Sequence, residues 1–307
     1  MYECDVVVIG GGPAGIAAAL SAEACGAKKT ALIERGGKLG GILNQCLHSG
    51  FGIGRFGSEL RGTEYAEFLR GKIAGSKVEV FLDTAVIRLG SDGTMLLSGA
   101  YNGKMKAGAT VLASGCRETP AGALPIAGSR PAGIFTAGAV QKFINVLGYD
   151  IGERILVLGS GDVGMIVAER LVQLGKEVIA VIEQNNRCGG LERNRLRCLQ
   201  ANDIPLLTGC TITRILGEGR ISGAEAVEIK SGREWVIPCD TLVISVGLVP
   251  ERELAEEACE GGVIPPWLFI CGNAEHVHQI VDSAEAQAEE IGRKAAAYAA
   301  AEHRKRC

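Results

Sequence analysis

Two glycine-rich turns carry the residue types and spacing that could do chemistry in this sequence. In the first, Gly10, Gly12 and Gly15 follow a short apolar run at residues 6–9 in the pattern G-x-G-x-x-G. Between a strand and a helix, the first glycine allows the tight turn, the second lets a pyrophosphate approach the backbone, and the third lets the helix pack closely. The positive end of the helix then attracts the phosphates.

An acidic residue stands where a nucleotide ribose would need it. A helix of small residues is expected at 14–24, and a second apolar strand at 30–33 ends at Glu34. A carboxylate at this interval from the glycines accepts hydrogen bonds from ribose hydroxyls. The bare glycine pattern also occurs in tight turns of unrelated α/β proteins. The strand, helix, second strand and terminal acid together indicate a dinucleotide site.

The whole pattern occurs a second time. Gly159, Gly161 and Gly164 follow an apolar run at 154–158, and a later strand ends at Glu183. The interval from the first glycine to the acid is the same in both copies, which indicates an internal duplication. The helix of the second copy is expected at about 163–174 and its second strand at 178–182.

Each copy then continues with short alternating runs and a strand that ends in glycine. The sequence therefore predicts an α/β fold with two Rossmann-like dinucleotide-binding domains, each three-layered, with a parallel sheet and a β-meander. A helix rich in alanine and glutamate is expected at 283–304. The alternating runs and closing strands are 78–82, 86–89, 94–97 and 110–115 in the first copy, and 211–215, 226–229, 235–237 and 241–247 in the second.

Composition excludes several other classes of protein. The net charge of −3 and the 5% aromatic content argue against nucleic acid as a partner. The 11 cysteines contain no Cys-x-x-Cys, so we expect no metal site, and their spread favours a reducing, cytoplasmic location. Residues 6–22 are uncharged, but an acidic flank and internal glycines indicate strand, turn and helix rather than a membrane segment. The 44 glycines among 307 residues suit a chain that folds around two dinucleotides.

With these motifs, the chain resembles the FAD-dependent pyridine nucleotide-disulfide oxidoreductases, and in length the small thioredoxin reductase type. The segments TVLASGCR at 110–117 and ICGNA at 270–274 resemble two further family motifs. The resemblance implies that the second domain is inserted in the first. It places the FAD-binding domain at 1–119 and 248–307 and the NAD(P)-binding domain at 120–247.

The redox cysteine pair of that family is missing. Residues 135–140, where small thioredoxin reductases carry Cys-x-x-Cys, contain no cysteine, and 40–46 offers only Cys46. A flavin-to-dithiol relay needs two thiols, so disulfide reduction is disfavoured. Asn273 also replaces the aspartate of the family's C-terminal motif. Its amide oxygen can still accept a ribityl hydroxyl, but the negative charge is lost.

A narrower resemblance is to a subgroup without redox cysteines. The segments at 44–52, 114–138 and 271–282 are similar to NAD/FAD subunits of opine oxidase and hydrogen cyanide synthase. They are also similar to the short flavoprotein associated with anaerobic glycerol-3-phosphate dehydrogenase-like proteins. The resemblance implies that substrate oxidation takes place on a partner flavoprotein dehydrogenase subunit.

The predicted cofactor contacts follow from the motifs and from the resemblance. Glu183 favours NAD over NADP, because its carboxylate accepts the ribose 2′-hydroxyl and repels a 2′-phosphate; it could also be a solvated strand-end acid. The expected FAD contacts are Gly10, Gly12, Pro13, Ala14, Gly15, Glu34, Arg35, Gly40, Gly41, Ile42, His48, Val86, Ser114, Gly115, Gly272, Asn273 and Ser283. The expected NAD contacts are Gly159, Ser160, Gly161, Asp162, Val163, Gly164, Glu183 and Gly247.

Three side chains are candidates for a part in the reaction: His48, Cys46 and His278. An imidazole near a flavin can relay protons or stabilise charge. The alternatives are hydrogen-bonded packing histidines and, for Cys46, a buried small apolar residue. A helix starting near Ser283 would direct its positive end at the flavin pyrimidine edge.

The sequence thus predicts an FAD-dependent oxidoreductase that transfers hydride or electrons between NAD(H) and a second redox centre. That centre is expected on a partner dehydrogenase of glycerol-3-phosphate or amino/hydroxy-acid type. The first alternative is an electron-transfer or assembly subunit with little activity alone. A thiol–disulfide reductase is the second alternative.

Overall fold

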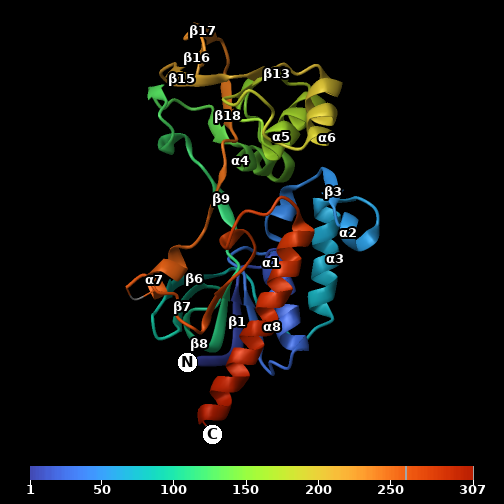
Figure 1. Cartoon of the computed structure of the whole chain (residues 1–307), viewed down its shortest axis with the longest axis vertical. Helices are drawn as coiled ribbons and strands as arrows, with labels where there is room; N and C mark the ends of the chain where they lie inside the picture. Colours follow the sequence, from blue (N-terminus) through green and yellow to red (C-terminus); the bar gives the residue numbers. More distant parts are fainter. Residues whose placement is uncertain (260, 307) are drawn as a thin grey trace. The chain divides into compact units, whose positions relative to one another are not determined.

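The computed structural model describes residues 1–259 and 261–306, and the chain divides into two compact units (Figure 1). Unit 1 comprises 1–117 and 250–307, and unit 2 comprises 118–249. The division falls within two residues of the boundaries expected from the sequence. The chain passes between the units through β9 (Cys116–Glu118) and β19 (Leu248–Pro250).

Unit 1 is built on a seven-stranded sheet with the order β5-β2-β1-β8-β7-β6, and β20 pairs with β8 beside this path. The central strands β1, β2 and β8 are parallel, whereas β6 and β7 are antiparallel to their neighbours. The strands are β1 (Tyr2–Ile9), β2 (Thr30–Ile33), β5 (Glu79–Phe81), β6 (Thr84–Leu89), β7 (Thr94–Gly99), β8 (Gly103–Leu112) and β20 (Leu268–Ile270).

Side chains of β1 alternate between two cores, which gives unit 1 its three layers. Val6 and Val8 belong to a core beneath the helices, whereas Val7 and Ile9 belong to a core shared with the meander. Because successive side chains of a strand point to opposite faces, an uninterrupted apolar run is buried on both sides. This arrangement confirms the predicted layered α/β fold.

Three helices cover one face of this sheet: α1 (Pro13–Ala24), α3 (Gly62–Ala74) and α8 (Val281–Arg306). In Figure 1, α8 runs beside α1. A Cβ at Gly292 would lie 2.3 Å from the carbonyl oxygen of Ala18, so these two helices approach closely through small residues. Shorter elements of unit 1 are β3 (Ser49–Phe51), α2 (Ile53–Phe56), β4 (Leu60–Arg61) and α7 (Glu253–Ala258).

The expectation that residues 78–82 belong to the meander is wrong. The strand β5 at this place pairs in parallel with β2 and extends the parallel sheet. An edge strand that is buried on one face alternates in sequence like a meander strand, so the pattern could not distinguish the two. The meander consists of β6, β7 and the first part of β8.

Unit 2 repeats the parallel sheet in the order β11-β18-β12-β13-β14. Its meander forms a separate four-stranded sheet, β10-β15-β16-β17. The strand β8 has ten residues and can pair with both β7 and β1, whereas β18 has only four. The strands are β10 (Ala127–Gly128), β11 (Ile134–Thr136), β12 (Arg154–Leu158), β13 (Glu177–Glu183), β14 (Leu206–Thr208), β15 (Cys210–Leu216), β16 (Gly223–Glu228), β17 (Glu234–Ile237) and β18 (Thr241–Ile244).

The helices of unit 2 are α4 (Ala137–Lys142), α5 (Asp162–Gln173) and α6 (Glu192–Asn194). Three expected helix starts differ slightly from those observed. The helices α1 and α5 each begin one residue earlier, at Pro13 and Asp162, and α8 begins at Val281 rather than near Ser283. Among the described residues, no helix combines the length and the apolar composition that crossing a lipid bilayer requires.

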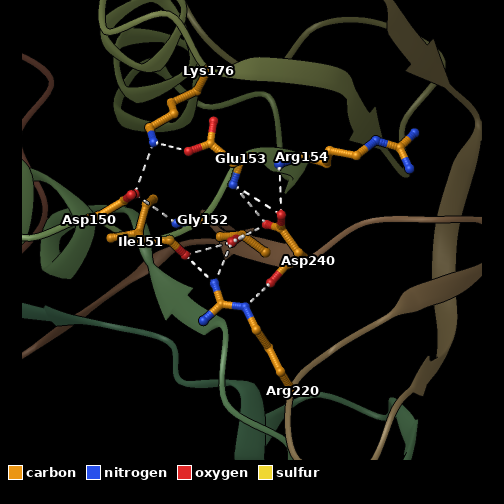
Figure 2. A network of polar contacts seen from close by, with 9 residues as sticks. Asp150, Ile151, Gly152, Glu153, Arg154, Lys176, Arg220 and Asp240 are labelled. Atoms are coloured by element: carbon orange, nitrogen blue, oxygen red, sulfur yellow. Dashed lines mark hydrogen bonds and ion pairs between the residues drawn. The ribbon is translucent and has the colours of Figure 1, made fainter.

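A polar network fixes the amino ends of β12 and β18 in unit 2 (Figure 2). The Asp240 carboxylate accepts the backbone N–H groups of Glu153 and Arg154 at 3.0–3.1 Å. The Arg220 guanidinium donates to the Asp240 carbonyl at 2.9 Å and to the Thr241 hydroxyl at 3.0 Å. The network lies at the end of the strands opposite to the glycine turn, so it stabilises the sheet away from the candidate site.

Candidate functional site

The first glycine turn has the backbone geometry that only glycine allows. Gly10 has φ +108°, and a Cβ there would lie 2.4 Å from the Ala113 carbonyl oxygen. A Cβ at Gly15 would lie 1.8 Å from the Gly10 carbonyl oxygen, because α1 packs directly on the turn. At both positions, other protein atoms fill the space that a side chain would need, so these two glycines are required for close packing.

Gly12 differs, because the space next to it is open. The nearest atom to a Cβ at Gly12 would be the Gly41 Cα, at 4.0 Å. Gly12 is also the N-cap of α1, whose amino end carries no side-chain cap and no acidic residue in its first turn. Pro13 begins the helix, followed by Ala14, so no long side chain crowds this end. The open backbone and uncapped helix end fit a pyrophosphate.

A second glycine pair covers the turn. The Gly40 N–H donates to the Gly11 carbonyl at 2.8 Å, and Gly41, with φ +53°, brings its backbone to the Gly12 Cα. The next residue, Ile42, is exposed. The expected contacts Gly40, Gly41 and Ile42 thus border the open space beside Gly12.

The Glu34 carboxylate ties the second strand to the glycine turn. Its two oxygens accept the Gly11 N–H at 2.8 Å and the Gly36 N–H at 2.7 Å. A carboxylate offers about four acceptor positions, so two stay open for ribose hydroxyls. Arg35 is exposed, and its guanidinium makes no hydrogen bond or ion pair with any residue that the structure describes.

Three further expected FAD contacts lie at the ends of strands or within them. The Ser114 hydroxyl donates to the Glu251 carbonyl at 2.6 Å, and Gly115, with φ +81°, has no atom within 4 Å of a would-be Cβ. Val86 lies in β6, where the pairing with β7 is irregular between Val86 and Arg88, and it packs against an apolar core. Gly115 is therefore open to a ligand, whereas Val86 serves the core.

The segment after β20 returns to the first turn. Gly272 has φ +61°, and a Cβ there would lie 2.5 Å from the Ala14 Cβ. Its N–H donates to the Gln287 side chain of α8 at 2.8 Å. The Asn273 amide oxygen accepts the His278 backbone N–H at 2.9 Å, and Ser283 is exposed in the first turn of α8. The structure thus joins Gly272, Asn273 and His278 to the amino end of α1.

Cys46 does not suit a reactive role. Its side chain is buried and donates to the Ile42 carbonyl at 3.3 Å, and burial raises the pKa of the Cys46 thiol to about 12. The thiolate is the reactive form of cysteine, so a raised pKa disfavours a reactive role at neutral pH. These observations favour the packing alternative for Cys46, and its part in the reaction stays an untested prediction. His48 is half-buried, with its ring 5.1 Å from that of Phe51.

The turn of unit 2 repeats the geometry of the first. Gly159 has φ +100°, and a Cβ there would lie 2.1 Å from the Ser245 carbonyl oxygen. A Cβ at Gly164 would lie 2.7 Å from the Gly159 carbonyl oxygen, whereas one at Gly161 would meet only the Ser245 oxygen at 4.0 Å. The middle glycine is again the open one, so this turn also fits a pyrophosphate.

The Glu183 carboxylate accepts more hydrogen bonds than the Glu34 carboxylate. One oxygen accepts the Ser160 N–H at 3.1 Å and the Ser160 hydroxyl at 2.6 Å. The other accepts the Asn185 N–H at 2.9 Å and the Asn185 side-chain amide at 2.7 Å. Burial raises the pKa of Glu183, but these hydrogen bonds outweigh burial and hold it below the ordinary value. Glu183 is therefore a fixed, ionised group at the end of β13.

The sequence analysis did not identify the glycine pair that covers the turn of unit 2, Gly189–Gly190. The Gly189 N–H donates to the Ser160 hydroxyl at 2.7 Å, and the Gly190 N–H donates to the Ser160 carbonyl at 3.0 Å. The pair Gly189–Gly190 stands at the same interval from its turn as Gly40–Gly41. Extending the internal repeat past the acid would have found this glycine pair.

Other expected contacts of unit 2 are placed around the same turn. The Asp162 carboxylate, in the first turn of α5, accepts the Leu191 N–H at 2.8 Å and the Asn194 side-chain amide at 2.7 Å. Val163 follows in the helix, and Gly247, with φ +127°, lies beyond β18. An open cavity of about 750 Å³ beside the turn is lined by Asn185, Asn186, Arg187, Cys188 and Gly189.

Each unit therefore offers a glycine turn with an open middle glycine, a helix end and an acid, which is the chemistry of dinucleotide binding. Within the described part of the chain, no group of three or more His, Cys, Asp or Glu side chains could hold a metal ion. Of the ten cysteines that the structure describes, all are free, and none forms a disulfide.

Comparisons with solved structures agree with this fold. A thioredoxin reductase from Lactococcus lactis superposes with a TM-score of 0.78 at 21% identity, covering 97% of this chain and 99% of that one. The T. acidophilum thioredoxin reductase gives a TM-score of 0.76 at 18% identity and covers 99% of each chain. At these identities the similarity establishes the two-unit dinucleotide-binding fold.

Three curated relatives are oxidoreductases or components of oxidases. The alpha chain of sarcosine oxidase from Rhizobium meliloti is 28% identical over 86% of this chain, which spans 26% of that protein. A ferredoxin–NADP reductase of Salinispora tropica is 26% identical over 82% of this chain and 76% of its own length. An opine oxidase subunit of Rhizobium meliloti is 26% identical over 83% of this chain and 52% of its own length.

A family model described as pyridine nucleotide-disulphide oxidoreductase matches residues 4–297, nearly the whole chain. The match includes both glycine turns, both strand-end acids and most of α8. This chain belongs to the pyridine nucleotide-disulphide oxidoreductase family and is an FAD-dependent oxidoreductase of that family.

Proposed function

We propose that this protein transfers hydride between NAD(H) bound by unit 2 and FAD bound by unit 1, and exchanges electrons with a partner dehydrogenase subunit. The duplicated turn–acid arrangement carries this proposal, because each copy leaves its middle glycine open to a pyrophosphate. The two cofactors supply the redox chemistry, and the protein binds and orients them.

The proposed FAD site of unit 1 combines the open Gly12, the uncapped amino end of α1 and the two free acceptor positions of Glu34. The C-terminal segment adds Gly272 and Asn273 beside Ala14. Asn273 holds His278 with its amide oxygen, which has a second lone pair for a ribityl hydroxyl. These groups support binding of FAD without a carboxylate at position 273.

The proposed nucleotide of unit 2 is NAD rather than NADP. The Glu183 carboxylate is ionised and fixed by Ser160 and Asn185 next to the cavity. A 2′-phosphate placed near this charge would be repelled, whereas a 2′-hydroxyl can donate to it when the Ser160 hydroxyl turns away. Arg187 at the cavity rim is a weaker attraction for phosphate because it is exposed.

The candidate reacting groups of unit 1 are two histidines. His48 and His278 are each half-buried, and each can hold or release a proton at a ring nitrogen. The first turn of α8, which includes Ser283, would present its backbone N–H groups to negative charge. Cys46 is left out of the reaction, because its thiol stays protonated.

A partner protein is proposed from two observations. The chain has no cysteine pair in the redox-motif positions of its family, which disfavours a dithiol relay within the chain. Two of its relatives are named as subunits of oxidases, and this chain spans only part of their length. We infer that the electrons pass to or from a partner, of glycerol-3-phosphate or amino/hydroxy-acid dehydrogenase type.

The test is anaerobic reduction of the purified yellow protein. NADH should bleach the flavin absorbance faster than NADPH at equal concentration. The isolated chain is then assayed with NADH and an artificial acceptor, alone and with whatever co-purifies from the native source. Rapid turnover by the isolated chain identifies a self-sufficient enzyme. Turnover that requires the co-purifying partner identifies the second candidate, an electron-transfer subunit. Failure of both nucleotides to bleach the flavin contradicts the proposal.

A further inference from the structure

Unit 1 contains a small polar cluster around His278 that the glycine motifs do not explain. It lies in the segment between β20 and α8, which is anchored at Gly272 against Ala14 of α1. Two of the four histidines of the chain are in this segment, and the rings of His276 and His278 are 4.0 Å apart. The cluster therefore adjoins the proposed FAD site without belonging to either glycine turn.

One side chain of α8 joins the two ends of the segment. The Gln287 side-chain oxygen accepts the Gly272 N–H at 2.8 Å and lies 3.0 Å from His278 Nε2. A backbone N–H can only donate, so the atom that faces Gly272 must be the amide oxygen and not the amide nitrogen. The orientation of the Gln287 amide is thereby fixed.

The same oxygen then decides which ring nitrogen of His278 carries hydrogen. An amide oxygen only accepts, so His278 Nε2 must donate to it. In the neutral imidazole one nitrogen donates and the other accepts, and Nδ1 is left as the acceptor. The contact with Gln287 persists when the ring gains a second hydrogen, because Nε2 still donates.

A second contact holds the backbone of the same residue. The Asn273 amide oxygen accepts the His278 N–H at 2.9 Å, and the Asn273 amide nitrogen faces Cys116 Sγ at 3.6 Å. The Arg252 guanidinium donates to the Ala274 carbonyl at 2.7 Å and to the carbonyl of Glu275. Both the main chain and the ring of His278 are thus held from neighbouring elements.

We propose that Gln287 is a positioning residue that fixes His278 with its hydrogen on Nε2, and that Nδ1 is the atom through which His278 accepts a proton at the site. In that step an N–H bond forms at Nδ1, the donor, a water or a bound substrate, loses one proton, and the ring gains one positive charge. No electron is transferred. The titratable group next to the ring is His276, and the contacts that hold the segment bring in Cys116, through Asn273, and the Arg252–Glu275 pair.

The proton-accepting role rests on the proposed function, because it places the flavin beside this segment. The tautomer assignment does not rest on the proposed function, since the contacts among Gly272, Gln287 and His278 determine the tautomer. The tautomer assignment and the proposed function can therefore fail separately. A protein with the expected tautomer that NADH does not reduce contradicts the proposed function and leaves the tautomer assignment standing.

The experiment is nitrogen NMR on flavin-loaded protein labelled with ¹⁵N-histidine, at a pH where the imidazoles are neutral. Only four histidines contribute, and loss of one signal set in His278→Asn assigns the relevant ring. Wild type should show His278 almost entirely in the form with hydrogen on Nε2. In Gln287→Leu, the tautomer populations of His278 should shift toward those of free imidazole. Gln287→Glu retains an acceptor oxygen and should keep the hydrogen on Nε2, as in the wild type.

Flavin content and circular dichroism check that each variant is folded. If Gln287→Leu does not fold, the wild-type spectrum still decides the tautomer assignment, because the contact with Gln287 requires hydrogen on Nε2. A wild-type His278 with hydrogen on Nδ1 overturns the proposal, as does an unchanged tautomer in folded Gln287→Leu. A pH profile of NADH-dependent bleaching tests the proton-accepting role: its acid limb should move to higher pH in Gln287→Glu, because the new carboxylate favours the protonated ring, and an unchanged profile contradicts the role.

Discussion

The Glu183 carboxylate accepts two hydrogen bonds from Ser160, one from the backbone N–H at 3.1 Å and one from the hydroxyl at 2.6 Å. The strand-end acid is thus locked to the glycine turn before any nucleotide arrives. Its counterpart Glu34 accepts one hydrogen bond from the equivalent turn residue, the Gly11 backbone N–H, and another from the Gly36 N–H. The two copies of the repeat share one geometry and differ in how firmly the acid is held.

Glu183→Gln should destabilise unit 2 and weaken the choice between the two nucleotides. The amide nitrogen of glutamine would face N–H donors of Ser160 or Asn185, which costs about 1–3 kcal/mol for a buried unsatisfied group. Loss of the charge should raise the rate with NADPH relative to NADH. The checks are urea unfolding and the ratio of kcat/KM for the two nucleotides. Glu34→Gln is the matched control, because it should reduce flavin content and leave that ratio unchanged.

The stability that Glu183 contributes should depend on pH. Because its folded pKa is below the ordinary value, its contribution is present above the ordinary carboxyl pKa and is lost as the pH falls through the folded pKa. Unfolding free energies of wild type and Glu183→Gln should therefore converge in acid. A difference that stays constant across this range would contradict the role of the ionised carboxylate.

Gly12→Ala and Gly15→Ala should fail in different ways. A methyl at Gly12 has 4.0 Å of clearance to the nearest protein atom, so the protein should fold but exclude the pyrophosphate and lose FAD. A methyl at Gly15 would lie 1.8 Å from the Gly10 carbonyl oxygen, so the fold should lose about 1–3 kcal/mol or more. Flavin absorbance per protein and thermal unfolding separate the two outcomes, and a flavin-replete Gly12→Ala would place FAD elsewhere.

Glu285 should make the protein less stable as the pH rises. This buried carboxylate of α8 accepts hydrogen bonds from Tyr65 at 2.8 Å and Arg55 at 2.9 Å, and its other oxygen has no partner among the described atoms. Burial raises the pKa of Glu285 above the ordinary value, although Tyr65 and Arg55 oppose this effect. The folded state then holds the proton more tightly than the unfolded state, so stability falls between the ordinary and the raised pKa.

Unfolding in urea at a series of pH values measures this effect. Glu285→Gln should remove the loss of stability, whereas Glu289→Gln, at a half-exposed carboxylate one helical turn away, should retain it. Equal pH dependence in wild type and Glu285→Gln would show that the buried carboxyl titrates normally.

Asp240→Asn should loosen unit 2 without touching either glycine turn. Burial raises the pKa of Asp240, but hydrogen bonds from Glu153, Thr241 and Arg154 outweigh burial and lower it. An asparagine nitrogen would oppose one of these donors, at a cost of about 1–3 kcal/mol. Glu153→Gln, which breaks only the exposed pair with Lys176, should change stability by about 0–1 kcal/mol. Unchanged flavin content in both variants is expected.

Cys46 should react slowly with thiol reagents. Its thiol is buried with a pKa raised to about 12, whereas Cys25 is exposed at the end of α1. Mass spectrometry after brief alkylation at neutral pH should find Cys25 labelled and Cys46 labelled only after unfolding. Cys46→Ser should leave flavin reduction by NADH unchanged. Rapid labelling of Cys46, with a charge-transfer band that this variant lacks, would support the thiol–disulfide reductase alternative.

Local sequence determined both glycine turns, their helices and their strand-end acids. These units are set by residues close in the chain: an apolar strand, a turn that needs positive φ at Gly10 and Gly159, and a helix that starts directly after the turn. The repeat and the family follow from the same short segments.

Only the tertiary structure decided which distant groups meet at the site. Alternation of apolar residues could not place β5 in the parallel sheet rather than in the meander, because both environments bury one face. The burial of Cys46, which raises the pKa of its thiol to about 12, is likewise a tertiary property that its sequence position does not show. The contact of Gln287 with Gly272 and His278 joins a loop to a helix across 15 and 9 residues, respectively. Such contacts depend on how α8 packs against α1, which no single segment of the sequence specifies.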